Sequence, residues 1–256
     1  MDKVVELKNV TMSYHTLDGE TQAIKNLSLD VRRGEFVSIV GPSGCGKSTL
    51  LSLISGLLKP SSGKIFIDNE PVTGTSSNVG YMPQRDHLFE WRTILKNTTL
   101  GLEIQNKLNK DTLKNAERLL EEYGLGEFKY YYPKQLSGGM RQRAALIRTL
   151  AASPEILLLD EPFSALDYQT RLAISEEIWV IIKKEKKTAI LVTHDIAEAV
   201  SMSDRVIVLT QRPGEVKSEH DIALTTCECK TPITCREAPE FRLYFNKIWK
   251  ELDVHV

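Results

Sequence analysis

The sequence has no long apolar run. Its longest apolar stretches, LLSLISGLL and EILLLDEP, fall well short of the roughly 20 residues that cross a bilayer. The first segment, MDKVVELKNV, also lacks the apolar core of a signal peptide. These absences predict a cytosolic chain without a membrane-spanning helix of its own.

The sequence also lacks an excess of charge of either sign and is poor in cysteine. Lys and Arg number 33 against 34 Asp and Glu, so the net charge is −1. With this balance the chain as a whole has no net positive charge that would attract nucleic acid. The 4 cysteines in 256 residues do not form a disulfide framework. A chain of this length suits one large domain, or a domain with an inserted lobe.

Strand and helix signals alternate along the chain. Strand patterns occur in VVELKNVTMSY, LSLDVRRGE, FVSIV, GKIFID and NVGYMP, and return in EILLLD, TAILVTH and RVIVLT. EILLLD and TAILVTH are too uniformly apolar to be half-exposed, which favours a parallel sheet covered on both faces. A helix is expected from about Lys47 to Leu57, and residues 93–152 are mostly helical in pattern, with Gly124 as a stop signal. We therefore predict an α/β core interrupted by a helical lobe.

A glycine-rich segment follows the apolar strand FVSIV and opens a helix. It matches the G-x-x-x-x-G-K-[ST] pattern, whose backbone N–H groups surround phosphates and whose helix start adds positive potential. Lys47 would reach the terminal phosphates and Ser48 would bind Mg²⁺. The residues expected to contact nucleotide here are Gly41, Pro42, Ser43, Gly44, Cys45, Gly46, Lys47, Ser48 and Thr49. Cys45, near Lys47 and a helix start, is expected to favour the thiolate and to react with thiol reagents.

Polar side chains follow three of the predicted strands. Asp160 and Glu161 end EILLLDEP, where ligands of open α/β sheets bind. Asp160 would hold Mg²⁺ and Glu161 could act as the general base, although a surface acidic pair is the plain alternative. His194 ends AILVTHD and is expected at the same sheet edge as Asp160, although a lone histidine there is usually structural. Gln84, after NVGYMP, is uninformative by itself.

A second anion-binding pattern lies in LSGGMRQR. Ser137, Gly138 and Gly139 lead directly into the helical run MRQRAALIRTLAAS. The amide groups and dipole at such a helix start favour a negatively charged group. A flexible turn before a helix is the plain alternative.

These motifs stand in the order of the ATP-binding cassette family, which the sequence resembles over nearly its whole length. The pieces that carry the resemblance are Tyr14 in MSY, GPSGCGKST, Gln84, LSGGMRQR, ILLLDEP, SALD ending at Asp167, and His194. The family's fold implies a phosphate-loop core with a mostly parallel sheet, an N-terminal antiparallel β subdomain and an inserted α-helical subdomain. The resemblance also implies ATP and Mg²⁺ as cofactors.

The family resemblance assigns further roles to these positions. Tyr14 would stack on adenine, Gln84 would bind Mg²⁺ and sense the transport partner, and Glu161 and His194 would drive hydrolysis. Two cassettes would dimerise head to tail, so that Ser137, Gly138 and Gly139 complete the partner's ATP site. Asp167 belongs to the same expected set of nucleotide-site residues.

The resemblance implies a division of the chain and a place in the cell. Residues 1–236 would form the ATP-binding domain, with a helical insertion at about 85–152. Residues 237–256 would hold a helix packed on that domain, with Phe241, Phe245, Ile248 and Leu252 on one face. The protein would sit peripherally at the cytoplasmic face of the cell membrane, bound to a permease.

Several segments are similar to those of bacterial importers for nitrate, sulfonates and taurine. These are EPFSALD, LFEWRTILKNTTLGLEI and APEFRLYFNKIWKEL. The expected partners are integral membrane permease subunits and, indirectly, an extracytoplasmic solute-binding protein, with no nucleic acid. Leu88, Phe89 and Trp91 would line the permease's docking groove, with core packing as the alternative.

Two other functions and one metal hypothesis remain. An exporter ATPase and a soluble cassette acting on nucleic acid or ribosomes share the ATP motifs. The tail places His220, Cys227, Cys229 and Cys235 close together, and these are the ligand types of tetrahedral Zn²⁺. The Cys227–Cys229 gap is shorter than usual for such sites, so we expect no zinc there.

Overall fold

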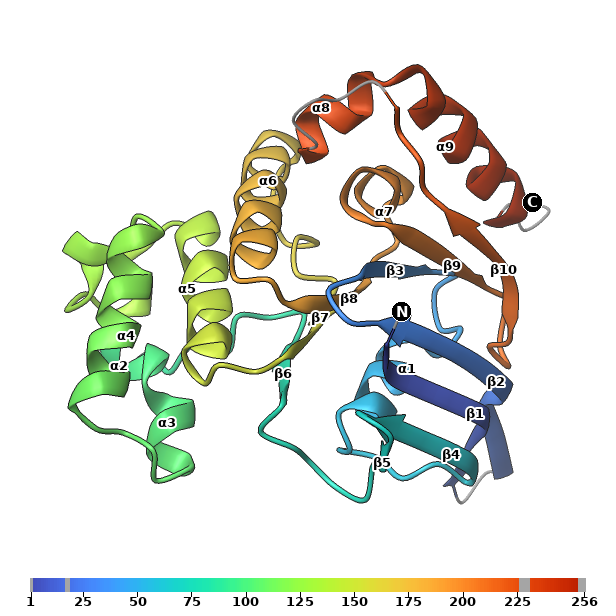
Figure 1. Cartoon of the computed structure of the whole chain (residues 1–256), viewed down its shortest axis with the longest axis horizontal. Coiled ribbons are helices and arrows are strands. Elements are labelled where there is room, and N and C mark those ends of the chain that lie inside the picture. Colours follow the sequence, from blue (N-terminus) through green and yellow to red (C-terminus); the bar gives the residue numbers. More distant parts are fainter. Residues whose placement is uncertain (1, 17–18, 226–230, 253–256) are drawn as a thin grey trace. The chain divides into compact units, whose positions relative to one another are not determined.

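The computed structural model describes residues 2–16, 19–225 and 231–252. The chain forms two compact units, one from residues 1–76 and 186–256 and the other from residues 77–185 (Figure 1). Among the described residues, every helix is too short or too polar to span a membrane.

The first unit contains an antiparallel sheet from the N-terminal part of the chain. Its strand order is β2-β1-β4-β5, and each neighbouring pair is antiparallel. The bounds are β1 Lys3–Thr16, β2 Gly19–Arg32, β4 Ser62–Ile67 and β5 Glu70–Pro71. This confirms the antiparallel N-terminal subdomain that the family resemblance implied.

A second sheet of the same unit carries the buried apolar strands. Strand β3 (Phe36–Val40) pairs in parallel with β8 (Thr188–Val192) and β9 (Arg205–Leu209), and β10 (Val216–Asp221) is antiparallel to β9. All residues of β3, β8 and β9 are buried. The mostly apolar sequence of these strands suits burial on both faces, and their few polar residues, Ser38, Thr188 and Arg205, are buried as well.

The helices of this unit flank that sheet. They are α1 Lys47–Ile54, α7 Ile196–Met202, α8 Pro232–Glu237 and α9 Pro239–Leu252. Helix α1 ends three residues earlier than predicted, because Gly56 adopts φ +75° and stops the helix. A side chain at Gly56 would also lie 2.1 Å from the carbonyl oxygen of Gly74.

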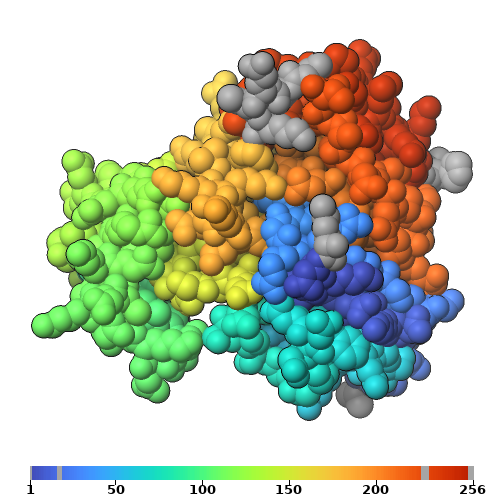
Figure 2. All heavy atoms as spheres, in the orientation of Figure 1, coloured from blue at the N-terminus to red at the C-terminus, as the bar shows by residue number. Residues whose placement is uncertain are grey.

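Helix α9 packs on the core beside this sheet. Ile248 is fully buried there with Val40 and Ile196, and Phe241 and Phe245 are partly buried against the same cluster. The space-filling view shows the red atoms of α9 forming one surface with the orange atoms of β10 (Figure 2). The tail helix is thus part of the packed unit.

The second unit is mainly helical, with two parallel strands. Strand β6 (Val79–Met82) pairs with β7 (Ile156–Asp160) in register from Val79–Ile156 to Met82–Leu159. The helices are α2 Ile94–Thr98, α3 Leu100–Ile104, α4 Lys110–Glu122, α5 Gly138–Ala151 and α6 Tyr168–Lys184, with short 3₁₀ turns η1 Gly126–Phe128 and η2 Pro133–Gln135. The predicted stop at Gly124 is confirmed by its φ of +75°.

Candidate nucleotide site

The glycine-rich loop lies between β3 and α1, as the sequence predicted. Gly44 has φ +74° and Gly46 has φ +104°, conformations that side chains other than glycine rarely adopt. A Cβ atom at Gly46 would lie 2.8 Å from the carbonyl oxygen of Ala23 on β2. The loop shape therefore depends on glycine at position 46 both for backbone freedom and for close packing.

Lys47 is held inside this loop. Its Nζ atom donates to the carbonyl oxygens of Gly41 at 2.8 Å and Pro42 at 3.0 Å. The side chain is almost fully buried. A buried ammonium bonded to the loop's own carbonyl groups places a positive charge where the loop turns.

Tyr14 on β1 lies beside the start of α1. Its hydroxyl is 3.2 Å from the Oγ1 atom of Thr49, and either atom could donate the hydrogen bond. Tyr14 remains 37% exposed. An exposed aromatic ring fixed through its hydroxyl suits stacking, but the adenine role stays a prediction.

The surroundings of Cys45 do not favour the thiolate that its neighbours in sequence suggested. Its side chain is fully buried, and a Cβ atom added to Gly41 would lie 2.7 Å from its sulfur. Burial raises the pKa of the Cys45 thiol, and the nearby Lys47 charge only partly opposes this. Proximity to a lysine and a helix start suggested a thiolate, but desolvation is the larger effect.

A buried hydrogen-bond network holds the backbone around His194. The Thr193 hydroxyl donates to Glu198 at 2.7 Å and accepts from the Asp195 N–H at 3.0 Å. Asp195 caps α7 by accepting from the N–H groups of Ala197 and Glu198. His194 lines a cavity of about 270 Å³ together with Gly41, Pro42 and Ser43. The structure thus brings this histidine beside the phosphate loop.

In the second unit, Asp160 ends β7 with a buried carboxylate. The Tyr81 hydroxyl of β6 donates to it at 3.0 Å. Sequence reasoning did not single out Tyr81. Tyr81 lies near the end of β6, but a single sequence does not reveal that β6 pairs with β7.

Glu161 follows with an unusual backbone. Its φ is +44°, in the left-handed region that costs about 1–3 kcal/mol for residues other than glycine. The Gln84 amide donates to its carboxylate at 3.3 Å and to the Ser164 hydroxyl at 3.2 Å. Strain of this kind concentrates at functional positions.

The second glycine pattern begins α5 as predicted. Ser137 caps the helix by accepting from the Met140 N–H at 3.2 Å. A Cβ atom at Gly139 would lie 2.8 Å from Cδ1 of Ile174 on α6, whereas one at Gly138 would reach no atom closer than 3.4 Å. Gly139 therefore permits helix packing, while a Cβ atom at Gly138 would make only an ordinary contact with Leu166.

Asp167 has a structural task that the motif did not reveal. Its carboxylate caps α6 by accepting from the Thr170 N–H at 3.1 Å. Hydrogen bonds from Thr170 hold the pKa of Asp167 below its usual value. The carboxylate is therefore charged at neutral pH.

The segment after Gln84 divides between core and surface. Leu88 is buried, so core packing is correct for that residue. Phe89 and Trp91 are exposed, and their rings stack with centroids 4.9 Å apart. The Asn97 side chain fixes the segment by accepting from the Phe89 N–H at 2.7 Å and donating to the Phe89 carbonyl at 3.0 Å. The exposed pair is thus held on a rigid support.

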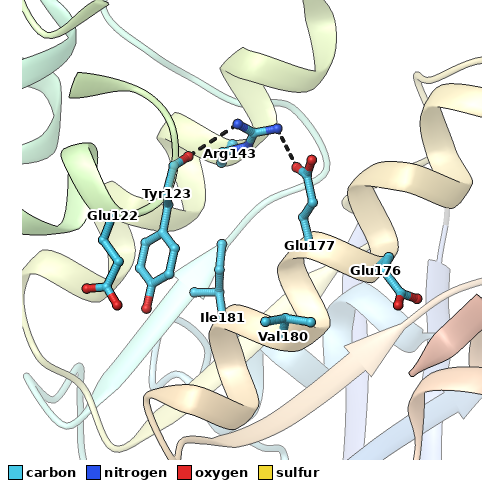
Figure 3. A pocket seen from close by; sticks show the side chains of 7 residues that line it. All are labelled: Glu122, Tyr123, Arg143, Glu176, Glu177, Val180 and Ile181. Atoms are coloured by element: carbon cyan, nitrogen blue, oxygen red, sulfur yellow. Dashed lines mark hydrogen bonds and ion pairs between the residues drawn. The ribbon is translucent and has the colours of Figure 1, made fainter. Parts of the chain in front are cut away.

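Arg143 ties α5 to its neighbouring helices. It donates to the carbonyl oxygen of Tyr123 at the end of α4 and to the carboxylate of Glu177 on α6 (Figure 3). These residues line a cavity of about 310 Å³ that Val180 and Ile181 also border. Arg143 therefore helps to fix the orientation of α5, the helix that Ser137 caps.

The tail cluster proposed for zinc is only partly described. His220 is buried and bonds Glu251, with Nε2 3.0 Å from Oε2, and Cys235 is buried in the core beneath α9. Cys227 and Cys229 lie outside the described residues. Within the described residues no group of three metal-binding side chains occurs. The zinc hypothesis itself therefore stays untested.

Comparison with known proteins identifies the family. A sequence profile described as ABC transporter matches residues 24–164. An uncharacterised ABC transporter ATP-binding protein of Bacillus subtilis, YtlC, is 45% identical over 97% of this chain and 95% of its own length. The Synechocystis nitrate import ATP-binding protein NrtD is 42% identical over 90% of this chain and 88% of its own length.

Two further proteins extend this likeness. The aliphatic sulfonates import ATP-binding protein SsuB of Bacillus thuringiensis is 40% identical over 83% of each chain. Among solved structures, the ATP-binding cassette MJ0796, a post-hydrolysis dimer bound to ADP and Pi, matches with a TM-score of 0.72 and 34% identity. That match covers 86% of this chain and 99% of the MJ0796 chain. The profile and the relatives together show that this chain belongs to the ABC transporter family and is an ABC-type ATPase.

Proposed function

We propose that this protein is the energy-coupling ATPase of a bacterial importer for a small anion or organic solute of the nitrate, sulfonate or taurine kind. The observation that carries the proposal is the likeness to NrtD and SsuB over 83–90% of this chain. An exporter subunit or a nucleic-acid ATPase would share the ATP motifs, but no structural observation favours either.

ATP binds through the loop of residues 41–49. The loop amides and the Lys47 ammonium contact the phosphates, and Lys47 exchanges the Gly41 and Pro42 carbonyl groups for phosphate oxygens. Tyr14 stacks on the adenine. The charge of Lys47 is already desolvated, so its attraction to phosphate is strong.

The residues proposed to hold Mg²⁺ fit that ion. Ser48, Gln84 and Asp160 supply oxygen atoms, the ligand type that Mg²⁺ prefers, and Asp160 offers a buried carboxylate that suits a cation. Mg²⁺ held by these residues would neutralise charge on the phosphate oxygens. Glu161 accepts a proton from the attacking water, and His194 donates a hydrogen bond to the γ-phosphate.

Two copies of the chain share the work of hydrolysis. Ser137, Gly138 and Gly139 open α5, and their amides and helix dipole bind the γ-phosphate held by the partner's loop. Asp167 belongs to the same nucleotide interface. The similar cassette MJ0796 is a dimer bound to ADP and Pi, which supports dimerisation of this chain. Loss of the γ-phosphate removes the bridge and lets the two copies separate.

The exposed Phe89–Trp91 pair receives the permease. Large apolar side chains on a rigid support are typical anchors of an interface. The protein sits peripherally at the cytoplasmic face of the membrane through this contact. The solute-binding protein outside the membrane acts on it indirectly, through the permease.

A deletion strain tests the proposal. Growth should fail on one nitrate, sulfonate or taurine source and return with the wild-type gene but not with Lys47→Ala. Tagged protein should also co-purify a polytopic membrane protein, and Trp91→Ala should weaken this, while Leu243→Ala on the exposed face of α9 should not. Normal growth on all these sources, or salt-dependent nucleic-acid binding instead of permease capture, would contradict it.

A further inference from the structure

The last turn of the tail helix lies beside the phosphate loop. Trp249 and Leu252 of α9 line the same cavity of about 270 Å³ as the loop residues 41–43 and His194. This volume is below the range of about 300–1,000 Å³ typical of small-molecule pockets. At about 30 Å³ for each water molecule, the cavity has room for about nine. The cavity lies at the edge of the phosphate site, and the tail helix α9 forms one of its sides.

The core fixes α9 on the elements that carry this edge of the phosphate site. Ile248 packs with Val40 and Ile196. Val40 directly precedes the phosphate loop, and Ile196 follows His194 by two residues. A shift of α9 would therefore displace the residues next to both the phosphate loop and His194.

Further contacts hold the end of the helix where Trp249 lies. Glu251 accepts a hydrogen bond from the Ser218 hydroxyl on β10 and bonds His220, with Nε2 3.0 Å from its carboxylate. The Trp249 ring stacks on Phe245, with centroids 6.0 Å apart, and Phe245 stacks on Phe241 at 6.3 Å. The indole is thus supported by a row of rings, although Trp249 is 55% exposed.

We propose that Trp249 is a positioning residue for ATP hydrolysis. Its indole closes the open side of the cavity and keeps the His194 imidazole in its working position. The inference rests on the proposed roles of residues 41–49 and His194. It explains why a half-exposed tryptophan is supported so firmly at the end of a tail helix.

Loss of the Trp249 side chain is expected to change turnover but not ATP binding. ATP affinity comes from the loop amides and Lys47, so Trp249→Ala should leave ATP binding nearly unchanged. Misplacement of a catalytic group by a small distance can reduce turnover about 10- to 100-fold, and we expect a loss of kcat in that range. A role in folding alone would instead lower the amount of active protein without a change in kcat per active site.

The experiment compares three substitutions in the full-length protein. Trp249→Ala should lose kcat, Trp249→Phe should recover most of it, and Leu243→Ala, 70% exposed on the same helix, should match wild type. Active-site titration with a tight-binding ATP analogue counts competent sites in each variant. Wild-type kcat per site in Trp249→Ala would overturn the proposal.

Tryptophan emission gives a second and independent readout. The sequence has 3 tryptophans, at positions 91, 179 and 249. Nucleotide should change the emission of wild type and of Trp179→Phe, and the change should be lost in Trp249→Phe. An emission change that persists in Trp249→Phe would count against the indole's place at the site. This arm still decides if Trp249→Ala fails to fold.

Failure of the inference differs from failure of the proposed function. If Lys47→Ala and Glu161→Gln abolish hydrolysis while Trp249→Ala behaves like wild type, only the role of Trp249 is overturned. If Lys47→Ala hydrolyses ATP like wild type, the proposed site itself is wrong, and the inference falls with it.

Discussion

The side-chain amide of Gln84 donates a hydrogen bond to the carboxylate of Glu161, with Nε2 3.3 Å from Oε2. Gln84 begins the segment that leads to the exposed pair Phe89 and Trp91, and Glu161 is the proposed general base. If the proposed permease contact moves this segment, the movement would reach the proposed base through this one hydrogen bond. Under the proposed function, this contact would link permease docking to ATP hydrolysis.

Glu161→Gln should stop hydrolysis while ATP still binds. The amide keeps the size of the side chain but cannot accept the proton, and loss of a general base typically costs about 10²- to 10⁴-fold in rate. Phosphate release and equilibrium nucleotide binding measure the two effects, and gel filtration should show a dimer trapped with ATP. Glu127→Gln, an equivalent change on the exposed turn η1, is the control. Near wild-type turnover would remove Glu161 from this role.

Ser137→Arg should block hydrolysis without preventing ATP binding to the single chain. The longer side chain would meet the γ-phosphate held by the partner, and it also removes the cap that accepts from the Met140 N–H. Mixing this variant with Lys47→Ala should restore part of the activity, because one of the two sites then has both motifs intact. Loss of ATP affinity in the Ser137→Arg monomer would instead indicate a site completed within one chain.

Gly139→Ala should destabilise the protein, and Gly138→Ala should not. The new methyl group at 139 meets Ile174 at 2.8 Å, and overpacking typically costs about 1–3 kcal/mol. At 138 the nearest atom is 3.4 Å away, and alanine favours the helix by up to about 1 kcal/mol. Urea unfolding measures both. The double variant Gly139→Ala with Ile174→Ala should lose less unfolding free energy than the sum of the losses in the two single variants.

Cys45 should react slowly with iodoacetamide at neutral pH. Burial raises the pKa of its thiol, so the thiolate fraction is lower than that of an ordinary cysteine, and the sulfur is also inaccessible. Peptide mass spectrometry over time should show labelling that accelerates only at alkaline pH. Protein unfolded in urea, which labels quickly, is the control. Rapid labelling of the native protein at neutral pH, prevented by ATP, would restore the original thiolate hypothesis.

The bond of Glu251 to Ser218 and His220 should lose its stabilising effect in acid. Burial raises the pKa of Glu251, but these hydrogen bonds outweigh burial and hold the pKa below its usual 4.5. A lowered folded-state pKa gives stability that is complete above the unfolded value and is lost as pH falls through the folded one. The difference in Tm between wild type and Glu251→Gln should therefore be largest at neutral pH and shrink in acid. A difference that grows in acid would contradict this assignment.

The sequence by itself determined the features that depend on neighbouring residues. The glycines of residues 41–46 specify a loop whose backbone angles few other residues adopt. The mostly apolar sequences of β3 and β8 predict burial on both faces. Ser137 predicts the start of α5. These signals are local, because backbone freedom, capping and strand periodicity act over a few residues.

Only the tertiary structure decided what surrounds each side chain. Cys45 was expected to be reactive from its neighbours in sequence, yet packing around the loop buries it and raises its pKa. Leu88 and Trp91 share a short segment, but one is buried and the other exposed. Tyr81 meets Asp160 and Trp249 meets the cavity of His194 across long separations in sequence. Burial, desolvation and such contacts depend on which distant segments pack together, and a local pattern of residues does not specify that.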